Sequence, residues 1–211
     1  MKEYKLPIGC DVPETIILAD GDFPSHPLAL EWLRQCPYVV CCDGAANTYI
    51  RSGRMPEAIV GDGDSLLPDI KERYASLIHS EAEQETNDLS KAFRFCLSQE
   101  RKRITIMGAT GKREDHTIGN VSLLADYMEQ AEVSMMTDYG IFVPIREDSM
   151  FESYIGQQIS VFNMNSTALS AEGLAYPLSV FTKVARDFLN EALARHFIIR
   201  TEGKVLVFRV F

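Results

Sequence analysis

The stretch Ala58-Ile59-Val60-Gly61-Asp62-Gly63-Asp64-Ser65 decides which fold the rest of the chain is expected to have. An apolar run that stops at a turn is typical of a buried β-strand. Asp62 and Asp64 would then follow the carboxyl end of that strand, where open α/β sheets place their ligands. Two carboxylates so close together repel each other in a dry site. Mg²⁺ would relieve that repulsion while it shares phosphate oxygens as ligands. For these eight residues alone, a polar turn that caps the next helix is an equally good interpretation.

Similar patterns recur through the first two-thirds of the chain. Apolar runs end in acidic or glycine-rich turns, and segments with helical spacing lie between them. This alternation predicts βαβ units, with a parallel sheet that carries helices on both faces. The turns all follow carboxyl ends of strands, so we expect them to line one edge of the sheet. The expected strands span residues 15–19, 38–42, 58–60, 76–79 and 103–107. The expected helices include 27–35, 47–52, 68–74 and 117–129, and another that begins after an N-cap at residue 86 or 87 and has its apolar face within residues 89–97.

Two earlier turns repeat the acidic pattern of residues 61–65. The first strand leads into Asp20-Gly21-Asp22, and the second leads into the sequence Asp-Gly-Ala-Ala-Asn at 43–47. Small residues at 44–46 let a helix begin close to its strand, and they leave the amides of its first turn free for an anion.

Asp88 and Lys91 fall in the first turn of a helix for which Thr86 or Asn87 is a good N-cap. The two charged residues lie three positions apart and therefore neighbour each other on the helix surface. Taken alone, the pair is best interpreted as a surface ion pair worth about 0.3–0.5 kcal/mol. Its place beside the acidic turns makes it a candidate for the same site.

The loop at residues 108–116, Gly-Ala-Thr-Gly-Lys-Arg-Glu-Asp-His, resembles a Walker loop only superficially. In that motif Ser or Thr follows the lysine, whereas here Arg113 follows Lys112. A glycine-rich loop with Lys and Arg between a strand and a helix still suits phosphate, because Arg binds two oxygens at once. Asn120 lies one turn from His116, so both would face one cleft, although a single histidine is more often an N-cap neighbour or a hydrogen-bonded core residue.

The pattern changes after residue 131, where short strands separated by turns replace the alternation. A second, mostly β domain is therefore expected to begin near residue 141. A small β domain leaves strand edges exposed, which favours pairing of two chains. The expected strands span residues 132–137, 141–145, 158–162, 197–200 and 205–210, and the one expected helix spans 181–194.

Composition restricts the possible partners. The 211 residues fit one large domain or two small ones, and 46% of them are hydrophobic, enough for a sizeable core. The net charge of -9 argues against a nucleic-acid or membrane partner, since both need basic surface. Five cysteines without a C-x-x-C pair favour core thiols in a reduced cytoplasm. No apolar signal segment or membrane-spanning run is expected.

Taken in order, these motifs resemble those of the thiamine pyrophosphokinase family. Any one of them is a weak signal, but all five in sequence are specific, and the match extends from about residue 15 to 210. The matching segments are Asp43-Gly44-Ala45-Ala46, Gly61-Asp62-Gly63-Asp64-Ser65, Thr86-Asn87-Asp88 with Lys91-Ala92, Gly111-Lys112-Arg113-Glu114-Asp115-His116 with Asn120, and Gly173-Leu174-Ala175-Tyr176-Pro177-Leu178.

The resemblance implies an α/β catalytic domain at residues 1–140 and a β-sandwich at 141–211 that holds thiamine and forms a homodimer. It also implies sites between subunits, Mg²⁺ as cofactor, and transfer of a diphosphoryl group from ATP to the thiamine hydroxyl with release of AMP. One departure concerns the substrate contacts, because Leu189 stands before Asn190 where the family usually has serine.

The resemblance and the chemistry of the side chains together assign roles. Asp115 or a metal-bound carboxylate would accept the proton of the hydroxyl, and contact with the cationic or amino part of thiamine is an alternative role for Asp115. The expected catalytic residues are Asp62, Asp64, Asp88, Lys91, Arg113 and Asp115, of which the first three would hold Mg²⁺, joined by Asp43 directly or through water. The expected ATP contacts are Asp43, Gly44, Gly61, Asp62, Gly108, Thr110, Gly111, Arg113, His116 and Asn120, and the expected thiamine contacts are Asn87, Asp115 and Asn190.

Two other functions compete with this hypothesis. A phosphatase with an aspartyl nucleophile would also carry Asp-x-Asp after an apolar strand, but it would hydrolyse its substrate without thiamine and leaves the loop at 113–116 unexplained. A nucleotide-sensing or thiamine-binding module would keep the pocket and dispense with several carboxylates. The presence of Asp43, Asp62, Asp64 and Asp88 together favours catalysis.

Overall fold

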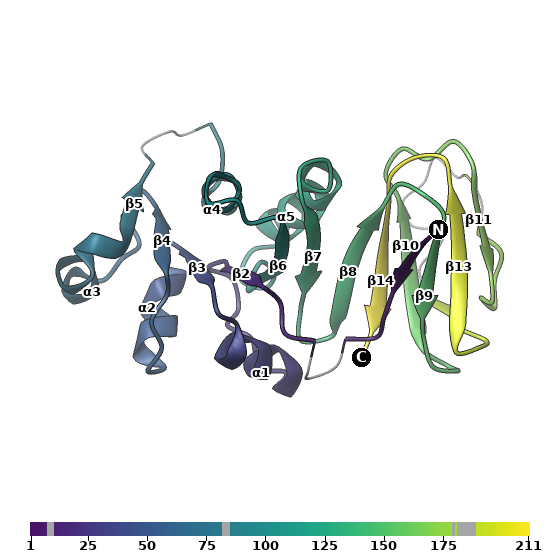
Figure 1. The fold of residues 1–211 in the computed structure, drawn as a ribbon, viewed down its shortest axis with the longest axis horizontal. Helices are drawn as coiled ribbons and strands as arrows, with labels where there is room; N and C mark the ends of the chain where they lie inside the picture. Colours follow the sequence, from purple (N-terminus) through teal and green to yellow (C-terminus); the bar gives the residue numbers. More distant parts are fainter. Residues whose placement is uncertain (8–10, 82–84, 179, 181–188) are drawn as a thin grey trace.

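The computed structural model describes residues 1–7, 11–81, 85–178, 180 and 189–211. An α/β part and a strand-rich part lie side by side in it (Figure 1). The helices are α1 (Pro27–Gln35), α2 (Ala45–Arg51), α3 (Pro68–Arg73), α4 (Asp88–Ser98) and α5 (Glu114–Tyr127), with a 3₁₀ turn η1 at Ala75–Leu77.

One sheet of ten strands runs through both parts. Its order is β12-β10-β14-β8-β7-β6-β2-β3-β4-β5. The six strands from β7 to β5 are parallel, whereas β8 pairs antiparallel with β7 and begins the strand-rich part. The strands are β2 (Thr15–Leu18), β3 (Val39–Cys42), β4 (Ala58–Gly61), β5 (Ile78–Ser80), β6 (Arg103–Met107), β7 (Glu132–Met136), β8 (Gly140–Ile145), β10 (Gln158–Asn163), β12 (Asn190–Glu191) and β14 (Val205–Val210).

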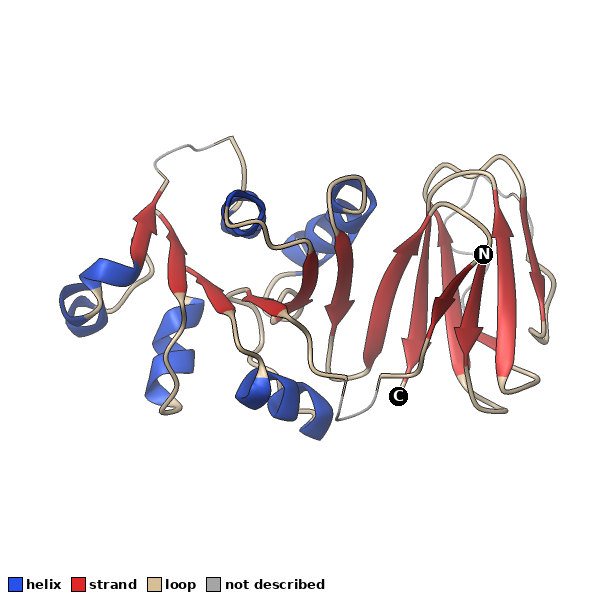
Figure 2. Cartoon of the chain, viewed as in Figure 1, coloured by secondary structure: helices blue, strands red, loops and turns tan. Residues whose placement is uncertain are grey.

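Helices cover both faces of the parallel strands (Figure 2). Alternate side chains of a strand point to opposite faces, so Ile17 packs in the core with Phe93 of α4 and Leu124 of α5. Its neighbour Ile16 packs in the core on the other face, with Trp32 of α1. Burial on both faces explains why these strands have continuous apolar sequences.

The strand-rich part is a β-sandwich. Its second sheet has the order β1-β9-β13-β11 and lies against β8, β14 and β10. Phe151 and Phe197 stack in the core between the sheets, with ring centroids 5.0 Å apart. The strands of this sheet are β1 (Lys2–Tyr4), β9 (Ser149–Glu152), β11 (Leu169–Glu172) and β13 (His196–Thr201).

The connection between β5 and β6 creates a crevice at the carboxyl edge of the parallel sheet. The chain adds β3, β4 and β5 to one side of β2 and then returns through α4 to place β6 on the other side. Open α/β sheets bind ligands at such a reversal of strand order. The loops after β2 and β6 continue the pairing beyond the strands, because the amide of Gly21 donates to the carbonyl of Gly108 (2.6 Å) and that of Asp22 to Thr110 (2.8 Å).

The expected α/β fold with a C-terminal β-sandwich is confirmed, but the structure corrects three details. Helix α5 begins at Glu114, three residues earlier than expected, so His116 lies in its first turn. Part of the helix expected at 181–194 lies outside the described residues, and in the described part Asn190 and Glu191 form a strand instead. Strands β1, β9 and β11 were not expected.

The sheet continues from β7 into β8, and the division of the chain after residue 140 stays a prediction. The described helices include none that is both long and apolar enough to cross a membrane.

Candidate active site

A cleft of about 460 Å³ lies at the carboxyl edge of the parallel strands. The loops after β2, β3, β4 and β6 and the first turns of α4 and α5 form its walls. Most of the residues expected at the site line it, namely Asp43, Gly44, Asp62, Asn87, Asp88, Lys91, Gly111, Arg113, His116 and Asn120.

Asp43 follows β3 and is almost completely buried. Its φ of 30° lies in the left-handed region, which Asp tolerates better than most residues. The amide of Ser65 donates to its Oδ2 (3.0 Å), which ties the turn at 61–65 to β3. Gly61 permits this approach, since a Cβ there would lie 2.7 Å from the Cβ of Asp43. The two turns therefore pack together because a side chain is absent at Gly61.

Few polar partners compensate the negative charge of the Asp43 carboxylate. Its Oδ1 is buried, and no donor within the described part of the chain reaches it. Burial raises the pKa of Asp43, and repulsion from Asp88, Asp62 and Asp64 raises it further, while the hydrogen bond from Ser65 acts in the opposite direction. A cation beside Asp43 would offset this cost.

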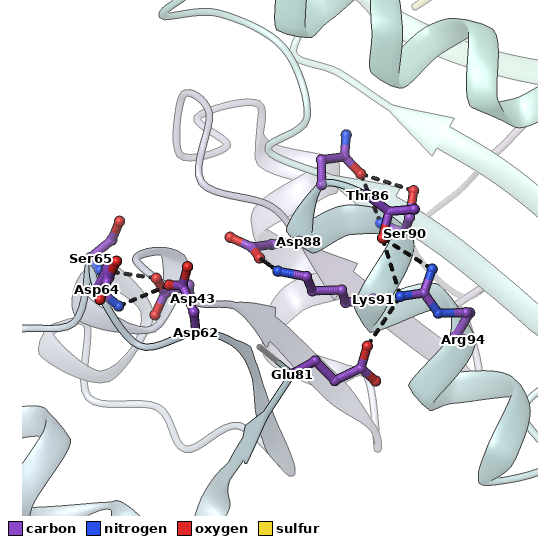
Figure 3. A network of polar contacts seen from close by, with 11 residues as sticks. Asp43, Asp62, Asp64, Ser65, Glu81, Thr86, Asp88, Ser90, Lys91 and Arg94 are labelled. Carbon is purple, nitrogen blue, oxygen red and sulfur yellow. Dashed lines mark hydrogen bonds and ion pairs between the residues drawn. The ribbon is translucent and has the colours of Figure 1, made fainter. Parts of the chain in front are cut away.

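Asp62 and Asp64 lie on one tight turn. The amide of Asp64 donates to Oδ1 of Asp62 (3.0 Å), and Lys71 of α3 fixes the turn by donating to the carbonyl of Gly63 (3.0 Å). Asp62 lines the cleft, whereas Asp64 is exposed beside it. Figure 3 shows Asp88 and Lys91 projecting from α4 toward this turn.

The first turn of α4 supplies a buried cation. Asn87 caps the helix by accepting from the amide (3.0 Å) and the hydroxyl (2.9 Å) of Ser90. Lys91 donates to Asp88 (3.0 Å), and its side chain is only 4% exposed. Since Lys91 is buried at the cleft, the interpretation of this pair as a surface ion pair is wrong.

A chain of side-chain amides joins α4, α5 and the loop after β6. Asn87 donates to Oδ1 of Asn120 (3.0 Å), and Nδ2 of Asn120 donates to the carbonyl of Ala109 (2.9 Å). Ser90 continues the chain to the hydroxyl of Tyr127 (2.8 Å). Asn120 is buried, and both ends of its amide are already bonded. In this arrangement Asn120 holds three walls of the cleft together.

Arg113 and Asp115 form a bidentate pair at the start of α5, with distances of 3.0 Å and 2.5 Å. Both side chains are more than half exposed. The hydrogen bonds from Arg113 lower the pKa of Asp115. A carboxylate with a lowered pKa is a weaker base, and Asp115 itself does not line the cleft. His116, one residue further, does line it.

Three expected ATP contacts shape the cleft through the backbone and do not line it. Gly61 ends β4, Gly108 follows β6, and the carbonyl of Thr110 accepts from Asp22. Gly108 and Gly111 both have positive φ, 65° and 80°, which favours glycine at these positions.

Asn190 lies in β12, outside this cleft. Its Oδ1 accepts from the amides of Tyr176 and Glu191 (3.0 Å each), and its Nδ2 donates to the carbonyl of Tyr176 (2.8 Å). The buried side chain thus fixes the segment at 173–178, and its contact with thiamine stays a prediction.

Asp20 and Lys112 also line the cleft. The sequence assigned no role to Asp20, whereas Lys112 belongs to the loop expected to suit phosphate. Lys112 donates to the carbonyl (2.7 Å) and to Oδ1 (3.1 Å) of Asp20. The signal for Asp20 was present, because its turn repeats the acidic pattern of the turn at Asp62. The pairing with Lys112 depends on β2 and β6 being neighbours, which the sequence pattern does not specify.

Magnesium suits the chemistry of the carboxylates. Asp43, Asp62 and Asp88 offer hard oxygen donors around one cleft. The buried Oδ1 of Asp43 has no hydrogen-bond donor among the described residues, so a bound cation would compensate its negative charge. Within the described residues, no three His, Cys, Asp or Glu side chains are arranged as a metal site. Mg²⁺ is usually held by one or two carboxylates plus substrate phosphates, so such a prearranged cage is not required.

Family models match most of the chain. The catalytic domain of thiamin pyrophosphokinase matches residues 29–136, and the substrate-binding domain of thiamin pyrophosphokinase matches residues 140–208. The two matches adjoin where β7 passes into β8.

Relatives with the same name match about half of the chain. Thiamine pyrophosphokinase 1 of Oryza sativa subsp. japonica is 30% identical over 129 residues, which cover 49% of this chain and 49% of the relative. Thiamine pyrophosphokinase of Bacillus subtilis is 34% identical over 86 residues, 39% and 40% of the two chains. The chain thus spans about half or less of the length of these curated relatives.

Solved structures show the same fold over all or most of the chain. Thiamin pyrophosphokinase from Candida albicans has a TM-score of 0.79 at 17% identity and covers 100% of this chain and 93% of its own. The enzyme from Bacillus subtilis has a TM-score of 0.77 at 21% identity and covers 93% and 98%. Because the two family models together cover most of its length, the chain belongs to the thiamin pyrophosphokinase family.

Proposed function

We propose that this chain transfers the diphosphoryl group of ATP to the hydroxyl of thiamine, giving thiamine diphosphate and AMP. The observation that carries the proposal is the cleft itself, in which carboxylates from β3, β4 and α4 face a glycine-rich loop with basic residues. Phosphoryl transfer depends mainly on positioning and on stabilisation of charge. A cleft with acidic residues for a cation and basic residues for phosphate supplies both.

The loop after β6 is suited to the phosphates of ATP. Positive φ values at Gly108 and Gly111 turn the backbone tightly around the start of α5. The first turn of α5 carries the positive end of the helix dipole, which favours an anion. Arg113 lies at this N-terminus as its N-cap residue and lines the cleft. Its guanidinium would exchange Asp115 for phosphate oxygens.

On the opposite wall, Asp62, Asp64 and Asp88 would hold Mg²⁺, with Asp43 beside them. Bound there, the ion would neutralise charge on the phosphates. Lys91, buried in the same wall, keeps its ammonium beside Asp88 at the cleft. Lys91 thereby offsets part of the acidic charge that the phosphates would meet.

The chemistry requires one bond to form and one to break. The thiamine oxygen would bond to the β-phosphorus, and the bond from that phosphorus to the oxygen bridging to the α-phosphorus would break, so AMP leaves with the bridging oxygen. The proton of the hydroxyl needs an acceptor. A carboxylate of the Asp43, Asp62 and Asp88 group suits this role better than Asp115, whose pKa is lowered by Arg113.

Thiamine would contact Asn87 in the cleft and the sandwich through the segment that Asn190 fixes. A homodimer with sites between subunits, in the cytoplasm, completes the proposal. The match of residues 140–208 to a substrate-binding domain supports a role of the sandwich in holding the substrate.

A phosphorus NMR time course with the purified protein, ATP, Mg²⁺ and thiamine tests the proposal. AMP and thiamine diphosphate should appear together. ADP with thiamine monophosphate would indicate a different kinase, and free phosphate without dependence on thiamine would indicate a phosphatase. No reaction would leave only a binding function.

Variants test the metal ligands. Asp62→Ala should abolish turnover and change thermal unfolding little, because the partly exposed Asp62 side chain accepts one hydrogen bond, from the amide of Asp64, and adds little packing. Asp126→Ala, which removes a carboxylate that is 76% exposed on α5, is the matched control and should keep full activity. Near-normal turnover of Asp62→Ala would show that the metal assignment is wrong.

A further inference from the structure

The ion pair between Lys112 and Asp20 lies between the two central strands of the cleft. Asp20 follows β2, Lys112 follows β6, and these strands are neighbours at the point where the strand order reverses. Lys112 reaches both the backbone carbonyl and the carboxylate of Asp20, at 2.7 Å and 3.1 Å. The pair therefore lies where the phosphates of a nucleotide are expected.

The backbone holds Lys112 in this position at a cost. Its φ of 53° is in the left-handed region, which residues other than glycine adopt rarely. The two loops cannot separate easily, because the amides of Gly21 and Asp22 bond the carbonyls of Gly108 and Thr110. Strained conformations that the surroundings enforce are common at functional sites. The loop geometry thus directs the Lys112 side chain to Asp20.

The pair is nevertheless weak. The side chains of Lys112 and Asp20 are 54% and 46% exposed, so water and salt screen their attraction. A triphosphate carries several negative charges and offers Lys112 a stronger partner than one carboxylate. Breaking the ion pair with Asp20 would therefore cost little free energy, and the new contact of Lys112 with phosphate would more than offset that cost.

We propose that Lys112 is held in an ion pair with Asp20 in the free protein and that its ammonium moves to a phosphate oxygen when the nucleotide binds. This inference rests on the proposed function and deepens it. Asp20 acts as a positioning residue that keeps the ammonium in the cleft before the nucleotide arrives. After the exchange, Asp20 is left unpaired beside the phosphates, so it lowers the affinity for ATP in two ways, by competition for Lys112 and by repulsion.

A double-mutant cycle separates exchange from a static pair. The ligand is α,β-methylene-ATP with Mg²⁺, which cannot be cleaved between the α- and β-phosphorus, and binding is measured by calorimetry. Asp20→Asn should tighten binding about two- to fivefold, the range expected for losing an exposed competing ion pair. Lys112→Met should weaken it about tenfold, the scale of a charge-assisted bond to phosphate.

The decisive comparison is the effect of Asp20→Asn in the Lys112→Met background. If Lys112 moves to phosphate, Asp20→Asn in the Lys112→Met background can only remove the repulsion between Asp20 and the phosphates. The gain in affinity should then be smaller than in the presence of Lys112. A larger gain would show that Lys112 stays on Asp20 and neutralises it, and an equal gain would show that the two side chains act independently. Either result overturns the inference while the proposed function stands.

Two controls complete the experiment. Lys2→Met removes a comparably exposed lysine, paired with Glu132 at 3.5 Å outside the cleft, and should leave binding unchanged. The KM for thiamine should be unchanged in Asp20→Asn, whereas a merely structural role of Asp20 would alter the KM values of both substrates. If the unaltered protein does not bind the analogue at all, the proposed function fails and the exchange fails with it.

Discussion

At Gly21 the backbones of the two central loops of the cleft approach each other closely, and Gly21→Ala tests how strongly the site depends on this approach. A Cβ at Gly21 would lie 2.3 Å from the carbonyl oxygen of Thr110 and 2.4 Å from that of Gly108. Ordinary contacts begin at 3.4 Å, so the loops would have to separate by about 1 Å, which is 3.4 minus 2.3. Both obstructing atoms belong to the backbone, and no side-chain rotation can move them aside.

The expected cost combines lost hydrogen bonds and strain. Separation would stretch the bonds from Gly21 to Gly108 (2.6 Å) and from Asp22 to Thr110 (2.8 Å). Each is worth about 1 kcal/mol, and forcing a methyl group into a packed site adds about 1–3 kcal/mol. A total of about 3–5 kcal/mol lowers the melting temperature by about 6–20 °C for a chain of this size.

Activity should fall by more than the loss of folded protein explains, because a displacement of about 1 Å at a site can cost about 100-fold in rate. Calorimetry gives the melting temperature, and AMP release at a temperature where the variant is folded gives kcat/KM. Gly119→Ala is the matched control, since a Cβ there meets nothing within 4 Å and the position is in the middle of α5. It should stabilise the protein by about 0.5–1 kcal/mol. A Gly21→Ala protein as stable and active as the control would refute the reasoning.

Two further substitutions test the polar groups of the cleft. Burial and the neighbouring carboxylates raise the pKa of Asp43 above its usual 3.8. The folded state therefore binds the proton of this carboxyl more tightly than the unfolded chain does. The stability that the protonated carboxyl contributes is lost as pH rises through the raised pKa. Asp43→Asn should therefore stabilise the metal-free protein at pH 7 by about 1 kcal/mol, an advantage that shrinks toward pH 4 in urea titrations; an advantage independent of pH would contradict this assignment. Asn120→Ala breaks the bonds to Asn87 and Ala109 and should cost about 2 kcal/mol, whereas Ser122→Ala, on the exposed side of the same helix, should change the unfolding free energy by under about 0.5 kcal/mol. Equal losses in the two alanine variants would show that the amide chain does not brace the cleft.

The sequence was most informative where structure depends on local pattern. The strands that became β2, β3, β4 and β6 are buried on both faces, so their apolar runs stand out between polar turns. Helix α1 matched its expected bounds, from the proline at its start to Gln35. The turns at the carboxyl ends could be placed at one edge because parallel strands leave no other arrangement. Most of the expected cleft residues followed from that rule.

The remaining features depend on contacts between distant segments. Strand β9 has only two buried residues, Ser149 and Phe151, which is too few to give a clear alternating apolar pattern. It forms a strand because it pairs with β1 and β13. The hydrogen bonds of Asn190 with Tyr176 join residues 14 positions apart, and the contact of Asn190 with thiamine stays a prediction. The orphaned Oδ1 of Asp43 likewise arises from the close packing of two turns. No periodicity in the sequence encodes such features.

The pairing of β1 with β9 also sets an order of events during synthesis. Residues 2–4 leave the ribosome well before residues 149–152, which contain the strand against which they align. The intervening parallel strands and their helices can assemble while β1 has no neighbour. On its other side, β9 pairs with β13 at residues 196–199, which emerge later still. Strand β1 is therefore expected to dock later than the parallel strands that follow it in the sequence, and a nascent chain should expose β1 to chaperones until the sandwich closes.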